Sequence, residues 1–235
     1  MNENGNIFYV GGSKGGVGKS LFTFVLANYF LEKNSNILLV DSDTDNPDVY
    51  KAHKEMGLAN LACAINRLDS QNDWMDLSNL MEKYPDHLVI VNGAARTKES
   101  VQQNGEMFWE MLEMLKRRMT VFWMINIHRD SVELLHSFQQ SLPKTAIHVC
   151  RNLFFGQPEQ FEIYNTSKAR EKVEAQGKTL DFPVLSPSVA TALYSRRQPI
   201  KTAYEQMRIS EKVELSRWKN RCGEMLNKVI ENPKS

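Results

Sequence analysis

Short, uniformly apolar runs recur along the chain, separated by longer stretches that place apolar residues at every third or fourth position. Runs that are apolar at every position are typical of strands buried on both faces of a sheet. The longer stretches have the spacing of helices that pack on a sheet through one face. The predicted strands are 7–10, 37–40, 88–91, 121–127, 146–150 and 182–185, and the predicted helices are 21–33, 106–118 and 131–142.

This alternation predicts an α/β fold, with a doubly wound, mainly parallel sheet flanked by helices. In such folds the ligand binds beyond the carboxyl ends of the strands. The composition, 42% hydrophobic and 24% charged over 235 residues, is that of an ordinary globular protein with one sizeable core. We therefore expect a single domain over residues 1–235, with its functional residues just after the strands.

Charge is unevenly distributed along the chain. The formal net charge of +1 argues against a strongly basic protein that wraps nucleic acid. The segment 195–235, however, carries ten Lys or Arg residues against five Glu. Apolar residues within it recur near helical spacing from 209 to 230, so we predict a basic helical section at about 195–230.

The cysteine count and the lengths of the apolar runs indicate the cellular compartment of the protein. Three cysteines, none in a CxxC pair, do not make a disulfide framework or a zinc site, which favours a reducing cytoplasm. The N-terminal segment MNENGNIFYV lacks the basic and apolar regions of an export signal, and no run of eighteen apolar residues occurs. We expect a cytoplasmic protein without a membrane anchor.

The first predicted strand leads into GGSKGGVGKS, residues 11–20, and then into a helical pattern. Strand, glycine-rich turn and helix in this order are the context of a phosphate-binding P-loop. The last three residues of the segment match the end of the standard pattern G-x-x-x-x-G-K-[ST]. The position of the first glycine of that pattern is taken by Ser13, so the standard pattern is not met in full.

The residue types of this segment suit a polyphosphate. Gly15, Gly16 and Gly18 let successive backbone N–H groups face the phosphates, at the positive end of the following helix. Lys19 is expected to reach the β- and γ-phosphates, and Ser20 to offer its hydroxyl to Mg²⁺. The predicted nucleotide-binding residues here are Gly15, Gly16, Val17, Gly18, Lys19, Ser20 and Leu21.

The run KGGVGKS resembles the deviant Walker A motif of the ParA/MinD family of P-loop ATPases. The resemblance implies that the chain binds ATP. It also implies that the early lysine, Lys14, crosses into a partner subunit and touches the phosphates of its nucleotide, so that ATP binding produces a homodimer. The resemblance covers nearly the whole chain and is most specific at residues 10–20.

An acidic cluster, VDSDTDNPD at 40–48, follows the second predicted strand. Carboxylates at this edge, facing a polyphosphate, are suited to Mg²⁺ or to a water nucleophile. The resemblance implies that Asp43 orients the attacking water and that Asp41 lies nearer the metal. An ordinary role in capping the loop remains open for Asp43.

The third predicted strand ends at Asn92, where the family usually has an aspartate that holds the water shell of Mg²⁺. An amide oxygen accepts a hydrogen bond from a metal-bound water but lacks the charge that a divalent cation prefers. We expect weaker Mg²⁺ binding or slower hydrolysis, unless Asp41 compensates. The predicted metal-site residues are Ser20, Asp41, Asp43 and Asn92.

Two later segments are candidates for contact with the base. Asn152 stands just past the fifth predicted strand, where its amide can present a donor and an acceptor to an adenine edge. A turn asparagine without a ligand is the alternative. The resemblance places Ser186 and Pro187 in a stretch that borders the base.

The basic section at 195–230 has two interpretations. It packs on the sheet and leaves a solvated basic face, or it contacts DNA phosphates without reading sequence. The cations in question are Arg196, Arg197, Lys201, Arg208, Arg217, Lys219 and Arg221. Through the resemblance we also expect a DNA-binding adaptor or an activating protein as partner, with nucleoid association possible.

The leading hypothesis is an ATP-dependent dimerising switch with slow, Mg²⁺-dependent hydrolysis, similar to plasmid-encoded family members that partition, position or transfer DNA. The alternative is a nucleotide-binding scaffold that hardly hydrolyses ATP and recruits a protein partner, which Asn92 keeps open. A metabolic P-loop enzyme of the same fold is a third possibility, although no second substrate site is recognisable.

Overall fold

The computed structural model describes residues 5–12, 15–94, 98–142 and 145–231. The strands are β1 (Asn6–Gly12), β2 (Ile37–Asp41), β3 (Leu61–Ile65), β4 (Leu88–Asn92), β5 (Arg118–Ile125), β6 (Ala146–Asn152) and β7 (Thr179–Phe182). The helices are α1 (Lys19–Glu32), α2 (Asp48–His53), α3 (Gln71–Lys83), α4 (Lys98–Met114), α5 (Arg129–Ser141), α6 (Glu162–Asn165), α7 (Lys168–Gln176), α8 (Pro187–Arg196), α9 (Ile200–Gln206) and α10 (Ile209–Ile230).

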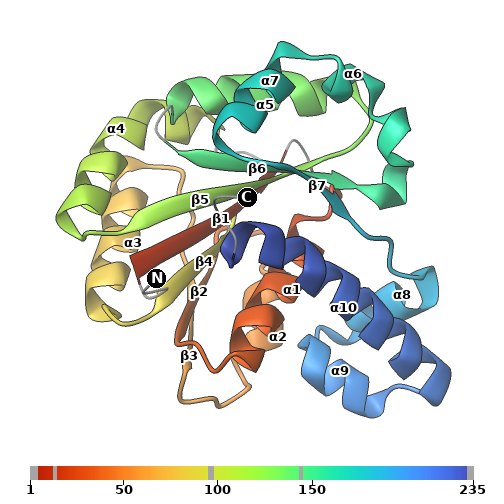
Figure 1. Ribbon diagram of the computed structural model, residues 1–235. Coiled ribbons are helices and arrows are strands. Elements are labelled where there is room, and N and C mark those ends of the chain that lie inside the picture. Colours follow the sequence, from red (N-terminus) through yellow and green to blue (C-terminus); the bar gives the residue numbers. More distant parts are fainter. Residues whose placement is uncertain (1–4, 13–14, 95–97, 143–144, 232–235) are drawn as a thin grey trace.

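The described strands form one sheet in the order β3-β2-β4-β1-β5-β6-β7 (Figure 1). Every neighbouring pair is parallel, so the predicted α/β fold with a doubly wound sheet is confirmed. After β1 the chain runs to β2 on one side, and later to β5 on the other. The segment that follows β1 therefore lies where the winding reverses, which is where ligands bind in such sheets.

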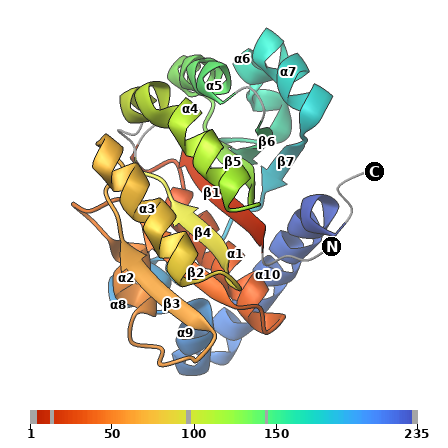
Figure 2. The ribbon, with the colours of Figure 1, turned by 90° about the vertical axis from the view of Figure 1, so that its left-hand side faces the viewer.

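Helices cover both faces of the sheet (Figures 1 and 2). Helices α3, α4, α5, α6 and α7 lie on one face, and α1, α2, α8, α9 and α10 lie on the other. Side chains of β1 alternate between the two layers: Phe8 and Val10 join one apolar cluster, and Ile7 and Tyr9 join the other. Uniformly apolar strands follow from this two-sided burial.

The structure corrects several predicted elements. The run at 182–185 is not a strand: β7 ends at Phe182, and its neighbours Pro183 and Val184 lie beyond it. The predicted helix at 106–118 ends early, because α4 stops at Met114 and β5 begins at Arg118. Strand β3 and helix α3 were not predicted. Strand β3, LACAI, is also a short apolar run, but it lies at the edge, is only half-buried, and contains two alanines, which have low β propensity.

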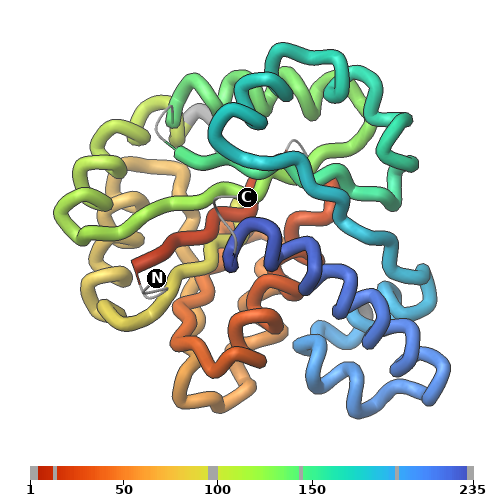
Figure 3. Tube along the Cα trace, in the orientation of Figure 1, coloured from red at the N-terminus to blue at the C-terminus, as the bar shows by residue number. Residues whose placement is uncertain are grey.

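The basic section, about 195–230, takes in the end of α8 and all of α9 and α10, and α10 spans the range where helical spacing was predicted. After β7 the chain leaves the sheet, turns through α8 and α9, and returns along α10 beside α1 (Figure 3). Leu215, Trp218, Cys222 and Leu226 of α10 are buried in the same cluster as α1. Within the described residues, no helix combines the length and apolar character needed to cross a bilayer.

Candidate nucleotide-binding site

The P-loop, residues 11–20, connects the end of β1 to the start of α1. Lys14 and Ser13 lie outside the described residues. Gly16 has φ 79° and Gly18 has φ 105°, in a region of backbone conformation that side-chain-bearing residues rarely adopt. A Cβ atom added at Gly15 or Gly16 would meet nothing within 4 Å, so the space beside this backbone is open. Exposed backbone N–H groups at a helix N-terminus suit an anion.

Asn152, at the end of β6, fixes the far side of this loop. Its Nδ2 donates to the carbonyl of Val17 at 3.0 Å, and its Oδ1 accepts from the backbone N–H of Phe154 at 3.1 Å. A Cβ at Gly18 would lie 2.6 Å from Asn152 Nδ2, so the glycine permits this close approach. The amide thus uses one donor and one acceptor within the protein, and its contact with a base stays a prediction.

Lys19, the first residue of α1, is 8% exposed although it carries an amine. Burial lowers the pKa of this amine, and the nearby Asp43 carboxylate opposes that shift by raising it. A buried cation at a helix N-terminus is costly unless an anion compensates it. The surroundings of Lys19 therefore suit a negatively charged ligand.

Asp41 and Asn92 end neighbouring strands and stand opposite each other in the β2–β4 register. Asn92 Nδ2 donates to Asp41 Oδ1 at 2.9 Å, and both side chains are buried. Asp41 Oδ1 also accepts from the N–H of Asp43, and its Oδ2 accepts from the N–H of Tyr50 at 3.0 Å. Burial raises the pKa of the Asp41 carboxyl, and the hydrogen bonds from Asn92, Tyr50 and Asp43 oppose this shift.

Thr23 connects this pair to the P-loop helix. Its hydroxyl lies 2.9 Å from the carbonyl of Lys19 and 3.2 Å from Asn92 Oδ1, both of which are acceptors. Ser42 connects the loops after β2 and β4, since its hydroxyl donates to the carbonyl of Asn92 at 2.8 Å and accepts from the N–H of Ala94 at 2.8 Å. Thr23 and Ser42 were not predicted from the sequence. Their adjacency to Lys19 and Asp41 was the only signal that pointed to them.

The contacts of Asp43 bear on both of its predicted roles, which are orienting the attacking water and capping the loop. Its N–H contacts Asp41, and its Oδ1 accepts from the N–H of Asn46 at 3.2 Å, which is the loop-capping interaction. Its charge nevertheless raises the pKa of the Lys19 amine, so the two groups are close enough to interact. Asp48 does not cap α2 through its side chain: it is the first residue of the helix, and its Oδ1 lies 3.1 Å from Arg197 Nε.

The remaining predicted site residues have fewer contacts with the P-loop and the Asp41–Asn92 pair. Ser20 and Leu21 follow Lys19 in the first turn of α1 and are half-buried. Ser186 precedes α8 and Pro187 begins it, beyond the end of β7, and in the described chain neither side chain bonds to the P-loop. Strand β7 is the neighbour of β6, so these two residues lie on the same side of the sheet as Asn152.

The donor set also allows a test of the expected metal. No group of three or more His, Cys, Asp or Glu side chains able to hold a metal is present in the described ranges. Both carboxylate oxygens of Asp41 already accept N–H hydrogen bonds. Ser20 and Asp43 remain as oxygen donors, which fits Mg²⁺ held mainly by phosphates and waters, the usual arrangement for this ion.

The chain is similar to known proteins in sequence and in fold. Protein MobD of Acidithiobacillus ferrooxidans is 42% identical over 226 residues, covering 96% of this chain and 98% of the relative. The MinD cell division protein of Aquifex aeolicus has a similar structure, with a TM-score of 0.56 and 13% identity over 95% of this chain and 97% of that one.

The signal recognition particle receptor FtsY of Elizabethkingia anophelis is also similar, with a TM-score of 0.53 and 14% identity over 77% of this chain and 59% of that one. At these identities the solved structures support the fold alone. Residues 8–181 match the CobQ/CobB/MinD/ParA nucleotide binding domain, which includes the P-loop, the Asp41–Asn92 pair and Asn152. The chain therefore belongs to the CobQ/CobB/MinD/ParA family of nucleotide-binding proteins.

Proposed function

We propose that this protein is an ATP-dependent dimerising switch that hydrolyses ATP slowly and acts in DNA partition, positioning or conjugative transfer. The observation that carries the proposal is an open glycine cradle next to the buried amine of Lys19, beside the acidic loop after β2. The family supports nucleotide binding, and the conversion of that binding into assembly and hydrolysis is the proposed step.

Each residue near the cradle has a role in this proposal. The backbone N–H groups of Gly15, Gly16 and Gly18 bind phosphate oxygens, and the Lys19 amine neutralises the β- and γ-phosphates. The hydroxyl of Ser20 and the carboxylate of Asp43 face Mg²⁺, which when bound neutralises charge on the phosphates. Asp43 also orients the attacking water. Because none of these groups is a strong base near the water, turnover is slow.

Lys14 is the residue proposed to join two copies, by contacting the phosphates bound to the partner subunit. Size-exclusion chromatography with light scattering tests this. The native protein should be a monomer in ADP and a dimer in ATP. Lys14→Ala should stay a monomer in ATP while still binding the nucleotide. Lys19→Ala, the matched change on the other lysine, should lose nucleotide binding itself. A Lys14→Ala protein that dimerises normally in ATP refutes the role.

The hydrogen bond between Asn92 and Asp41 favours a second candidate, a nucleotide-binding scaffold that recruits a protein partner and barely hydrolyses ATP. This hydrogen bond engages both side chains, which would otherwise be available to bind the waters around Mg²⁺. Steady-state phosphate release, with and without DNA and an adaptor protein, separates the two. Measurable release that Asp43→Ala abolishes, with accumulation of the ATP dimer, supports the switch. If the native protein releases phosphate no faster than Asp43→Ala does under any of these conditions, the result supports the scaffold.

The proposed cargo is DNA, bound without sequence reading through the basic section. Two of its candidate cations are already paired: Lys219 Nζ lies 2.6 Å from Glu32, and Arg197 lies 3.1 Å from Asp48. Arg217 and Arg221 are one helical turn apart on α10, exposed, and without an ion pair among the described residues. We assign the phosphate contacts to these two arginines.

Filter retention of duplex DNA over a range of salt concentrations tests the assignment. ATP should strengthen retention, since a dimer presents the patch twice. The double variant Arg217→Gln, Arg221→Gln should bind DNA more weakly and reduce the salt slope by about two. The matched double variant Lys168→Gln, Lys172→Gln, on α7 across the sheet, should behave as the native protein. Retention that ignores ATP or salt contradicts DNA as cargo.

A further inference from the structure

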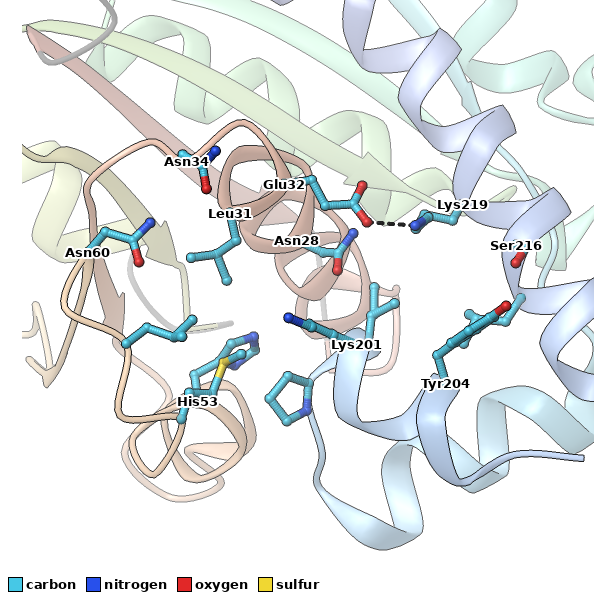
Figure 4. Close-up of a pocket in the computed structure, with 15 residues that line it drawn as sticks. Asn28, Leu31, Glu32, Asn34, His53, Asn60, Lys201, Tyr204, Ser216 and Lys219 are labelled. Carbon is cyan, nitrogen blue, oxygen red and sulfur yellow. Dashed lines mark hydrogen bonds and ion pairs between the residues drawn. The ribbon is translucent and has the colours of Figure 1, made fainter.

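A cavity of about 550 Å³ lies on the α1 face of the sheet, away from the P-loop (Figure 4). Its walls come from the second half of α1, the end of α2 with the segment leading to β3, and helices α9 and α10. Helix α1 rises about 1.5 Å per residue, so Leu31 is about 18 Å along the axis from Lys19. The cavity is therefore separate from the nucleotide site, and its volume is in the range that holds small ligands.

The amide of Asn28 is the first unusual feature of this cavity. Asn28 is 8% exposed, and no described residue forms a hydrogen bond with its side chain. Figure 4 shows it pointing from α1 toward the space in front of Lys201. The residue is largely buried but its amide lines the cavity, so water or a ligand in the cavity is left to satisfy its donors and acceptor.

Lys201 of α9 supplies a positive charge to the same space. Its amine points into the cavity beside Asn28, and it has no ion pair with any residue in the described ranges (Figure 4). The other charges nearby are balanced, since Lys219 is paired with Glu32 at 2.6 Å. Burial lowers the pKa of His53 to about 4, so its imidazole is neutral at physiological pH. Lys201 is an exposed residue, so the open side of the cavity carries one positive charge that has no ion-pair partner among the described residues.

The rest of the lining is mainly apolar. Ile200 and Leu215 are buried in the wall, and Leu31 and Met56 are partly buried there. Leu58 and Tyr204, which are 38% and 41% exposed, also line it. Apolar walls with a few convergent polar groups are the usual composition of a small-molecule site. The ammonium and the amide N–H groups together present donors that match a carboxylate.

We propose that this cavity binds a small aliphatic monocarboxylate, with its carboxylate between Lys201 and Asn28 and its hydrocarbon body against Ile200, Leu215 and Leu31. Such a ligand would satisfy the amide of Asn28 and the charge of Lys201 at once. It would contact α1, α9 and α10 together and thereby hold the basic section against the helix that carries the P-loop.

Titration calorimetry with octanoate, on the full-length protein without nucleotide, tests the proposal. The native protein should bind octanoate more tightly than 1-octanol, which has the same hydrocarbon body and no charge. Lys201→Met and Asn28→Leu should each weaken octanoate by about tenfold and leave 1-octanol unchanged, since each removes a donor to the carboxylate and keeps the bulk. Asn28 has no hydrogen bond to lose, so Asn28→Leu should fold normally.

Lys51→Met is the matched control, because Lys51 is exposed on α2 and does not line the cavity. It should bind octanoate as the native protein does. Equal affinity for octanoate in all four proteins would indicate adsorption to the surface and overturn the proposal. So would equal affinity of the native protein for octanoate and 1-octanol, or no binding at millimolar concentration. Because nucleotide is absent, these results are independent of the proposed ATP switch.

Discussion

The Asp41–Asn92 pair shows how one residue changes the chemistry of a strand end. The carboxylate of Asp41 is buried, and three N–H groups, from Asn92, Tyr50 and Asp43, bond to it. An aspartate at position 92 would instead bring a second carboxylate to the same place, where two buried negative charges repel. The amide therefore makes this edge of the sheet stable without a metal ion.

Asn92→Asp should accordingly lower the free energy of unfolding of the nucleotide-free protein by about 1–3 kcal/mol, because a hydrogen bond is lost and like charges meet. Mg²⁺ with ATP should restore more stability to the variant than to the native protein. Urea denaturation with and without these ligands measures both effects. Asn220→Asp, the same change on the exposed side of α10, should cost little. Equal urea midpoints for Asn92→Asp and the native protein would contradict this account.

Substitution of Asn152 can distinguish two ways in which this residue could contribute to ATP binding: by holding the P-loop or by contacting the base. If the amide mainly holds the P-loop through Val17, Asn152→Ala should weaken binding of both ATP and inorganic tripolyphosphate, since the cradle loses a fixed wall. We expect a loss of about tenfold for each ligand by titration calorimetry. If only ATP binding weakened, Asn152 would act on the base and not on the loop.

At the scale of elements, helix α10 is anchored to the end of the sheet by a buried, directed contact. Trp218 is fully buried, and its Nε1 donates to the carbonyl of Pro183 at 2.7 Å. Its ring lies 5.8 Å from that of Phe182 at the end of β7, in an edge-on arrangement. The contact ties the basic helix to the segment that leads to Ser186 and Pro187. The orientation of the proposed DNA surface thus depends on the end of the sheet.

Trp218→Phe should lower the free energy of unfolding by about 2 kcal/mol, because it leaves the Pro183 carbonyl unpaired and opens a small cavity. Trp109→Phe is a matched control, since Trp109 Nε1 is buried and has no hydrogen-bond partner among the described residues. Removing that N–H should be nearly neutral. Urea denaturation followed by circular dichroism compares the two, and similar losses would argue against a specific role of the Trp218 hydrogen bond.

At the scale of the whole molecule, two buried histidines make the folded state sensitive to acid. Burial lowers the pKa of His53 and of His148 to about 4. His148 Nδ1 accepts from the N–H of Lys178 at 3.0 Å, which requires an unprotonated nitrogen. Between pH 4 and 6.5 the unfolded chain binds protons at these positions that the folded protein does not. Stability therefore falls as the pH drops through this window and is complete above it.

The unfolding free energy should fall by up to about 3 kcal/mol for each histidine between pH 6.5 and 4. His148→Asn keeps an acceptor for Lys178 and removes the titration, so its stability should depend less on pH in this range. Urea denaturation at several pH values gives the slopes, and NMR titration of the imidazoles gives the pKa values directly. An imidazole of His148 that titrates near 6.5 would contradict the prediction.

Sequence patterns were sufficient to predict the strands that are buried on both faces of the sheet. They failed for strands that are only partly buried. Continuous apolar residues predict the central strands and α1. The glycines and Lys19 predict the P-loop. Strand β3 is a half-buried edge strand that was not predicted, and its apolar run is weakened by two alanines, which have low β propensity. The end of β7 was displaced because Pro183 and Val184 extend the apolar run beyond the sheet.

The positions of Asp41, Asn92 and Asn152 at strand ends were predictable, but the hydrogen-bond partners of their side chains were not. The chain order places Asp41, Asn92 and Asn152 after strands, and parallel topology brings these ends to one edge. That Asn92 donates to Asp41, or that Asn152 turns toward Val17, depends on strand register and side-chain rotamers, which no local pattern encodes. The cavity at Asn28 likewise arises from helices far apart in sequence.

The bond from Asn152 to Val17 spans 135 residues of sequence and has a consequence for synthesis on the ribosome. The glycine turn emerges early, but the amide that holds it arrives only with the sixth strand. A nascent chain interrupted before that point would carry the complete motif and still lack a finished pocket. Half-made copies would therefore hold the glycine turn loosely and bind nucleotide more weakly than the finished protein does.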